Sequence, residues 1–184
     1  MTADFDQDFV FSTSPGADAL VRRACHRLIE NCCGVSRATP NEDRRGIDYW
    51  VITPHSRTGL DLKLRSRDYA AGKNGSIDCV IELNGWGNTG WLLKAGGADL
   101  ILFACIDTGR FALFETKNLR TAVMVNLSRW IADGRVREIE TTSYRDGQHW
   151  KNRAVIVSAD LLTEAIDRLD ETDWIGAGND WVGR

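Results

Sequence analysis

The sequence predicts an α+β fold, or an α/β fold with a mixed sheet, and three observations indicate it. An amphipathic helix comes first, a run of strand-like segments follows, and helical patterns return near the C-terminus. Helices at both ends of a run of strands are typical of a central sheet with helices packed on its faces. The chain has 184 residues, which is the usual length of one domain.

The first helix is predicted to begin at Ser14-Pro15 and to continue to Cys33. Ser can cap a helix N-terminus, and Pro fits the first helical turn. Apolar residues then recur at intervals of three and four, and Gly34 follows as a stop signal. We expect residues 1–16 to form an N-terminal arm and residues 17–158 a core domain. Residues 159–184 are expected to form a helix and an acidic tail that pack on the core.

The middle of the chain reads as strands that are joined by polar or glycine-rich connections. Strands are predicted at residues 47–52, 60–65, 79–83, 100–106 and 111–114. The turn sequence Asp107-Thr108-Gly109-Arg110 predicts that the last two form a hairpin. Residues 36–46 are predicted as a polar, arginine-rich loop, and helices are predicted near residues 119–132 and 159–169.

Composition excludes several classes of protein. A net charge of −3 excludes a globally basic nucleic-acid coat, although residues 1–75 carry 11 Lys/Arg against 10 Asp/Glu. The sequence has no apolar run of the roughly 20 residues that a membrane-spanning helix needs, and no secretion signal, so we expect a cytoplasmic protein without a membrane partner. The five cysteines include no CxxC pair, which argues against a disulfide framework or a zinc site.

Two neighbouring predicted strands carry the residues with chemical potential. The segment 60–65 alternates strictly, so Asp61 and Lys63 share one face of the strand and Leu62 lies on the other. Asp48 begins the preceding strand. If the turn is centred at residues 54–55, Asp48 lies opposite Asp61, and side chains so paired are about 5 Å apart. If the loop instead spans residues 54–59, Asp48 lies about four residues too far along.

The first register predicts a site for a divalent cation. Two carboxylates and a backbone carbonyl, that of Leu62, are the hard oxygen ligands that Mg²⁺ prefers. Such an ion acidifies water and offsets the negative charge that develops on a phosphoryl oxygen. Lys63, on the face of Asp61, is then expected to orient the attacking water or to hold the scissile phosphate.

This arrangement resembles the PD-(D/E)XK nuclease superfamily. The resemblance rests on Gly46-Ile47-Asp48, followed after twelve residues by Asp61-Leu62-Lys63, in a chain that begins with a helix. This spacing is similar to that of resolvase-like members. Small bacterial and phage-borne members also have a later Ile-Glu strand and a Gly-Trp pair, which match Ile81-Glu82 and Gly90-Trp91. The resemblance covers about residues 17–115.

The resemblance implies a restriction-endonuclease-like fold with an α-β-β-β-α-β core, in which helices flank a central mixed sheet. It also implies Mg²⁺ or Mn²⁺ as cofactor and the hydrolysis of phosphodiester bonds. The literal Pro-Asp of the family is Ile47-Asp48 here. Members of the family often add a Glu from the first helix, for which Glu30 is the candidate in this sequence.

Two further observations bear on the choice of residues. Glu82 lies among apolar residues, and it is expected to be a metal ligand, a partner of Lys63 or of an arginine, or a solvent-facing residue. A second acidic-x-Lys pattern, Glu115-Thr116-Lys117, follows Asp107. It is the weaker candidate because Asp107 is better explained as a turn residue.

Several cations surround the predicted metal site in the sequence, and we expect them to contact nucleic acid. Contacts with phosphates would position a duplex without reading its sequence. The candidates are Arg44, Arg45, Arg57, Arg65, Arg67, Lys73 and Lys94. The acidic tail is expected to cap the domain or to meet a protein partner. Nucleases that cut both strands are often dimers, so a homodimer is a further expectation.

These observations favour a Mg²⁺-dependent nuclease that acts on DNA, with Asp48, Asp61 and Lys63 as its catalytic residues. The alternative is a nuclease-like fold without turnover, which binds nucleic acid or inhibits another protein, as some proteins of mobile elements do. The mild net acidity and the acidic tail favour this second reading.

Overall fold

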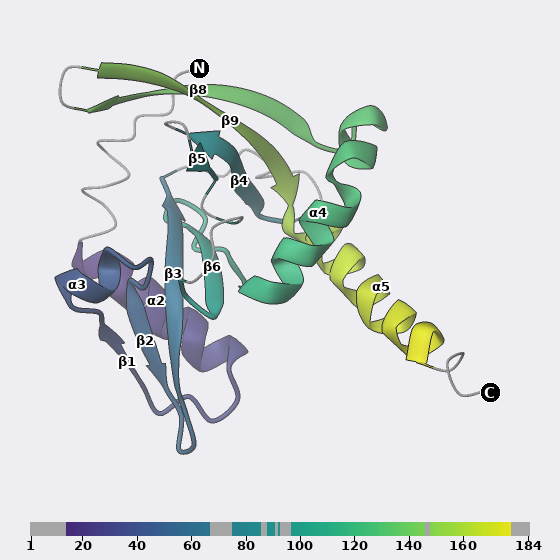
Figure 1. Cartoon of the computed structure of the whole chain (residues 1–184). Coiled ribbons are helices and arrows are strands. Elements are labelled where there is room, and N and C mark those ends of the chain that lie inside the picture. Colours follow the sequence, from purple (N-terminus) through teal and green to yellow (C-terminus); the bar gives the residue numbers. More distant parts are fainter. Residues whose placement is uncertain are drawn as a thin grey trace.

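The chain forms a mixed α+β structure, as the sequence predicts. The computed structural model describes residues 14–66, 75–85, 88–90, 92, 97–145 and 148–177. Two β-sheets and several helices are present in these ranges (Figure 1). Within them, every helix is too short or too polar to cross a bilayer. The predicted arm before residue 14 and the end of the tail after residue 177 lie outside the described residues.

A mixed sheet of five strands forms one half of the fold. Its members are β1 (Gly34–Arg37), β2 (Tyr49–Ile52), β3 (Arg57–Arg65), β6 (Leu100–Cys105) and β7 (Phe111–Glu115), in the order β1-β2-β3-β6-β7. The first three form an antiparallel meander, β6 runs parallel to β3, and β7 is antiparallel to β6. The mixed sheet and the β6–β7 hairpin confirm two predictions.

A second sheet contains two long neighbouring strands that the sequence did not predict. It consists of β4 (Asp78–Gly85), β5 (Asn88–Thr89), β8 (Arg137–Arg145) and β9 (Gln148–Ser158), in the order β5-β4-β9-β8 with all neighbours antiparallel. Only β4 was predicted. The hairpin of β8 and β9 extends along the top of the molecule in Figure 1.

Helix α2 (Pro15–Leu28) covers one face of the five-stranded sheet. Ser14 caps it, since its hydroxyl accepts a hydrogen bond of 3.2 Å from the backbone N–H of Ala17. Leu20, Val21, Ala24 and Cys25 are buried against β2, β3 and β6. The helix ends before Cys33, its predicted last residue, because Ile29 is extended and Asn31 adopts a left-handed backbone conformation with φ of 57°.

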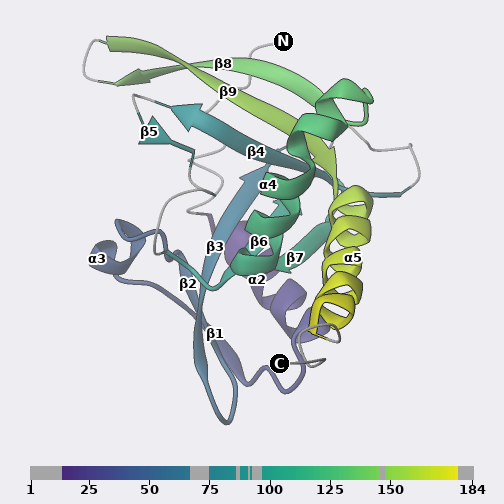
Figure 2. The same ribbon diagram turned by 45° about the vertical axis from the view of Figure 1, so that its right-hand side comes forward.

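The opposite face of the five-stranded sheet packs against α4 (Thr116–Ala132), α5 (Ala159–Ala177) and the inner face of the second sheet. Figure 2 shows α2 and α4 on opposite sides of this sheet. Ile101 and Phe103 of β6 lie in the same buried cluster as Ile81 of β4, Leu119 of α4 and Leu162 of α5. Both helices occur where the sequence predicts them, and the five-stranded sheet separates two hydrophobic cores.

The connection from β3 to β6 differs from the α-β-β-β-α-β order that the resemblance implied. Parallel neighbours need a crossover connection, which is usually a helix. Here the described residues between β3 and β6 form β4 and β5, which join the second sheet. The helix α3 (Pro40–Asp43) is the other short addition, because it lies between β1 and β2 in the segment predicted as a loop.

Candidate metal centre

The turn between β2 and β3 sets the register of the candidate site. Thr53 and Ser56 close it, with a backbone hydrogen bond of 2.9 Å from the Thr53 N–H to the Ser56 carbonyl. Ile52 therefore pairs with Arg57, and Tyr49 pairs with Leu60. This is the register with the turn centred at residues 54–55, which the sequence analysis preferred.

The regular pairing of β2 with β3 ends at Tyr49 and Leu60, directly after Asp48. The backbone N–H of Asp48 donates a hydrogen bond of 2.9 Å to the carbonyl of Leu60, one residue out of the register that would set Asp48 opposite Asp61. The predicted direct pairing of Asp48 with Asp61 is therefore not formed, although the two carboxylates are near enough for the charge of Asp61 to act on Asp48. On β3, Leu60 is buried beneath α2, so Asp61 lies on the other face.

Asp48 is held in place by the backbone of β3. One of its carboxylate oxygens, Oδ2, accepts a hydrogen bond of 2.7 Å from the N–H of Leu62. Burial and the nearby charge of Asp61 raise the pKa of Asp48 to about 7, against the lowering effects of the Leu62 N–H and of Lys63. The two carboxylates are therefore close enough to repel each other, which favours a proton or a cation between them.

Lys63 completes the group on this face of β3. Its Nζ lies 2.8 Å from Oδ2 of Asp61, and both side chains are largely buried, with 29% and 16% of their surfaces exposed. The polar face of β3 thus presents an ion pair beside the carboxylate of Asp48. Two residues further along, the half-buried Arg65 follows on the same face.

The backbone carbonyl of Leu62 is available as a third oxygen donor. In a β-strand, the N–H and C=O of one residue point to the same side of the strand. The N–H of Leu62 points to Asp48, so its carbonyl also points toward the β2 side, two positions past the end of the regular pairing. The donor set that the sequence predicts, two carboxylates and this carbonyl, is thus brought together.

This donor set suits a hard divalent cation that keeps part of its water shell. Two mutually repelling carboxylates, one of them with a raised pKa, supply the negative charge that such a cation needs. A group of three or more acidic, histidine or cysteine side chains with the arrangement of a metal site does not occur among the described residues. Water or substrate oxygens would therefore fill most of the coordination sphere.

Glu82 is not brought to this site. It lies on β4 in the second sheet, where it pairs with Ala154 of β9. Its neighbour Ile81 packs in the core between the two sheets, whereas Val80 and Ala154 belong to a cluster on the outer face. Alternation therefore turns Glu82 to the outer face, away from the five-stranded sheet. Of the three roles predicted for it, the structure favours the solvent-facing one.

The other acidic candidates also lie elsewhere. Glu30 is exposed and follows the end of α2, close to Cys33, whose N–H bonds to the carbonyl of Ile52 at the far end of β2. In the second acidic-x-Lys pattern, Asp107 lies in the β6–β7 turn and Glu115 at the opposite end of β7. Those two residues cannot share one ion.

The predicted nucleic-acid-binding cations fall into four groups, of which the first is the half-buried Arg65 on the face of Asp61 and Lys63. Arg44 and Arg45 are exposed in the turn after α3, which leads directly to Asp48. Arg57 is exposed and its guanidinium lies over the ring of Trp50, 4.0 Å from the ring centroid. The remaining candidates, Arg67, Lys73 and Lys94, lie outside the described residues, as does Trp91 of the Gly-Trp pair.

Asp99 is a residue of this region that the sequence analysis missed. Its carboxylate accepts a hydrogen bond of 3.1 Å from the N–H of Gly59, and its own N–H donates to the Gly59 carbonyl at 2.9 Å. These bonds fix the start of β6 against β3, two residues before Asp61. The available signal was an aspartate directly before a buried strand, the same position that Asp48 has before β2.

Comparison with protein-family models, with curated proteins and with solved structures finds no match to this chain. The resemblance to the PD-(D/E)XK superfamily therefore depends on the motif residues and on their register in the β2–β3 hairpin.

Proposed function

We propose that this protein is a metal-dependent nuclease that hydrolyses phosphodiester bonds, with DNA as its substrate. The observation that carries the proposal is the grouping of three charged side chains: the Asp48 carboxylate accepts the N–H of Leu62 beside Asp61, whose charge acts on it, and Lys63 lies 2.8 Å from Asp61. The restriction-endonuclease-like interpretation of the fold belongs to the same proposal. The helix–meander order of α2, β1, β2 and β3, followed by the parallel β6, supports it.

In this proposal, Asp48, Asp61 and the carbonyl of Leu62 hold Mg²⁺ or Mn²⁺. A bound divalent cation would supply positive charge to the phosphoryl oxygens in the transition state and would acidify a nearby water. Leu62 has a second role, because its N–H fixes the orientation of the Asp48 carboxylate. A ligand that is oriented before the ion arrives loses less entropy on binding it.

Lys63 supplies the fixed positive charge of the site. Its ammonium is held 2.8 Å from the carboxylate of Asp61 in a largely buried position. A preorganised cation in a partly desolvated site stabilises developing negative charge more strongly than an exposed one. We assign Lys63 the role of holding the scissile phosphate, while the exposed Arg44 and Arg45 contact phosphates further along the strand.

The experiment that tests the proposal is a cleavage assay with plasmid, linear duplex and branched DNA, with and without Mg²⁺. Asp61→Asn and Lys63→Ala should each lower the cleavage rate by about 100-fold or more, since each removes charge from the reacting centre. Glu82→Gln and Lys117→Ala are the matched controls and should leave the rate within a factor of two. Metal-dependent cleavage that survives in Asp61→Asn would refute the proposal.

A second function, binding of nucleic acid without turnover, is favoured by one observation. Only two carboxylates converge in the described part of the chain, and one of them is paired with Lys63. Titration with Mn²⁺ followed by calorimetry separates the two functions. Millimolar or tighter binding that is lost in Asp48→Asn supports the enzyme, whereas DNA binding without any metal binding supports the second function.

A further inference from the structure

The stacked pair of Trp50 and Arg57 lies beside the candidate metal centre and is not explained by the roles assigned so far. The guanidinium carbon of Arg57 lies 4.0 Å from the centroid of the Trp50 ring, which is the distance of direct face contact. The Arg57 side chain is 57% exposed. The guanidinium therefore contacts the face of the indole while more than half of the Arg57 side chain stays exposed.

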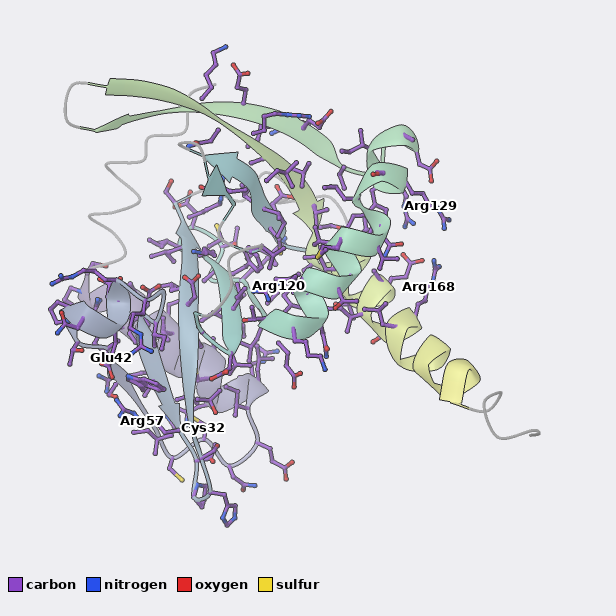
Figure 3. All side chains as sticks on the ribbon, viewed as in Figure 1. Cys32, Glu42, Arg57, Arg120, Arg129 and Arg168 are labelled. Carbon is purple, nitrogen blue, oxygen red and sulfur yellow. The ribbon has the colours of Figure 1, made fainter. Side chains whose placement is uncertain are left out.

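Glu42 of α3 fixes the guanidinium of Arg57 from a second direction. Its Oε1 lies 3.6 Å from an Nη atom of Arg57, and its other oxygen accepts hydrogen bonds of 2.7 and 2.8 Å from the N–H and hydroxyl of Thr39. The bonds with Thr39, together with the charge of Arg57, lower the pKa of Glu42, so the carboxylate remains ionised. Figure 3 shows Glu42 and Arg57 close together beside α3 and β2.

The pair lies on the two strands that carry the metal centre. Trp50 of β2 comes two residues after Asp48, and Arg57 of β3 shares a face with Asp61 because the two are four residues apart on the strand. The cross-strand neighbour of Trp50 is Gly59, which has no side chain on this face. Ile52, the partner of Arg57, is 39% exposed and adds an apolar surface at the far end.

From this arrangement, and resting on the proposed function, we infer that Arg57 on Trp50 is a stacking platform for an unpaired nucleobase of the substrate. The phosphodiester next to that base would then lie at Asp48 and Asp61. Guanidinium planes and aromatic rings are the surfaces on which proteins stack splayed bases. The substrate class is therefore a nucleic acid with a single-stranded segment at or beside the cleavage position.

The local charge favours a base over a phosphate as the group that meets Arg57. Glu42 is ionised and partly neutralises the guanidinium, so the attraction for a phosphate is reduced. The stacking of a flat neutral base is not weakened by this neutralisation, and such a base gains contact with the guanidinium and with the exposed Ile52. Arg44 and Arg45, which are exposed in the preceding turn, remain the better candidates for phosphate contacts.

The test measures binding in the Asp61→Asn background, which prevents cleavage, with fluorescent single-stranded and blunt duplex oligonucleotides of equal length. Arg57→Lys keeps the charge and removes the plane. We expect it to weaken single-strand affinity about five-fold or more and to leave duplex affinity within a factor of two. Arg129→Lys is the matched control, because Arg129 is also exposed and paired with an aspartate, on α4 away from Arg57 (Figure 3).

Three outcomes would overturn the inference. If Arg57→Lys binds single strands as tightly as the parent does, the stacking role of Arg57 is wrong, whereas the proposed function is not affected. Equal losses for single strands and duplex in Arg57→Ala, rescued in Arg57→Lys with the parent's salt dependence, identify a phosphate contact instead. If the parent binds neither oligonucleotide, the proposed function and the platform fail together.

Glu42→Gln is a second, independent test, because it is expected to raise an affinity that the Arg57 variants leave unchanged or lower. The amide retains an oxygen for the bonds with Thr39 but removes the charge that faces Arg57. We expect duplex affinity to rise at low salt, because the guanidinium is no longer neutralised, while the preference for single strands declines. An unchanged ratio of the two affinities would contradict the role assigned to Glu42.

Discussion

The carboxylate of Asp48 is subject to opposing influences. Its burial and the charge of Asp61 disfavour the ionised form, whereas the hydrogen bond from Leu62 and the ammonium of Lys63 favour it. The first pair is the stronger, so the pKa of Asp48 is raised to about 7. At neutral pH Asp48 is therefore partly protonated, and the proposed metal ion would have to compete with a proton.

Asp48 should make the metal-free protein less stable as the pH rises. Its pKa is higher in the folded state than the value of 3.8 expected for an exposed side chain, so the folded state binds the proton more tightly. The stabilisation is present below about pH 4 and is lost as the pH rises to about 7. Asp48→Asn should therefore gain on the order of 1–3 kcal/mol of unfolding free energy relative to the parent between pH 5 and pH 8.

Urea denaturation at a series of pH values measures this difference. Asn retains an oxygen that can accept the Leu62 N–H, so the hydrogen bond is matched between the two proteins. Asp107→Asn, in the exposed β6–β7 turn, is the control and should follow the parent at every pH. A constant difference between Asp48→Asn and the parent would show that Asp48 titrates normally.

Added Mg²⁺ should reverse the loss of stability, and it should do so only where Asp48 is ionised. A ligand that binds the folded state stabilises it by an amount that grows with the logarithm of its concentration relative to its dissociation constant, and so raises the melting temperature. Weak sites bind their ion in the millimolar range, so about 10 mM Mg²⁺ is a suitable concentration. Thermal denaturation should show a melting temperature that rises by a few degrees at pH 8 and hardly at all at pH 5.5. An equal rise in Asp48→Asn would place the ion elsewhere.

The position of a site residue could be predicted where local geometry determines it. It could not be predicted where the packing of distant elements determines it. A short turn fixes the register of β2 with β3 and so brings Asp48 near Asp61, and alternation puts Lys63 on the face of Asp61. Glu82 shows where prediction from local geometry ends. Alternation puts Glu82 and Ile81 on opposite faces of β4, but only the position of the second sheet decides which of the two residues is turned to the core.

At the scale of elements, periodicity predicted the segments that bury one clear face. The strict alternation of β3 and the three-four spacing of α2 and α4 gave their types correctly. The end of α2 was wrong, because Cys32 continues the apolar pattern by packing on the same core from the loop rather than from another helical turn.

The missed strands β1, β8 and β9 have weaker patterns. β1 begins at Gly34, the glycine that was interpreted as a helix stop, and only its first residues are partly buried. In β8, Glu138 and Glu140 flank the single apolar residue Ile139, and their charges meet Arg153 and Lys151 across the hairpin. Such a ribbon is stabilised by cross-strand pairs, which cannot be seen before its partner is known.

The short helix α3 should depend on its N-terminal cap. Thr39 and Glu42 form a capping box, in which each side chain bonds to the backbone N–H of the other residue. Thr39→Ala should lower the free energy of unfolding by about 1 kcal/mol. It should also weaken single-strand binding, because Glu42 loses the bond from the Thr39 hydroxyl and holds Arg57 less firmly.

Denaturant unfolding and oligonucleotide binding check both parts. Thr121→Ala is the matched control, since the exposed Thr121 hydroxyl bonds to the carbonyl of Lys117 within α4, where Ala is the better helix former. A Thr39→Ala protein that is as stable as the parent would show that α3 contributes nothing to the folded state.

At the scale of the whole molecule, the five-stranded sheet joins two cores into one cooperative unit. Leu102 and Ala104 of β6 belong to the core beneath α2, whereas Ile101 and Phe103 of the same strand belong to the core beneath α4 and α5. One strand therefore contributes alternate residues to both cores. Loss of packing on either side should be transmitted through β6 to the other.

We therefore expect the two cores to unfold in a single transition. A substitution in either core should shift the midpoint of unfolding by the same amount for both cores. Leu162→Ala in one core and Leu20→Ala in the other should each cost about 2–5 kcal/mol. Thiol labelling in urea, resolved for each cysteine by mass spectrometry, provides a probe in each core. Cys25 reports on the core beneath α2, and Cys79 reports on the other. Separate midpoints for these two thiols would show that the cores unfold independently.

The closeness of Asp48 and Asp61 in the chain affects the order in which the molecule assembles during synthesis. Both belong to one tight hairpin, so they meet as soon as residue 61 has left the ribosome, whereas β3 must wait for β6 and β4 must wait for β9. The emerging polypeptide thus brings two carboxylates together before the strands that shelter them exist. If Asp48 and Asp61 bind Mg²⁺ as proposed, the ion would also act on the nascent chain, because it would offset the repulsion between these carboxylates in the first hairpin.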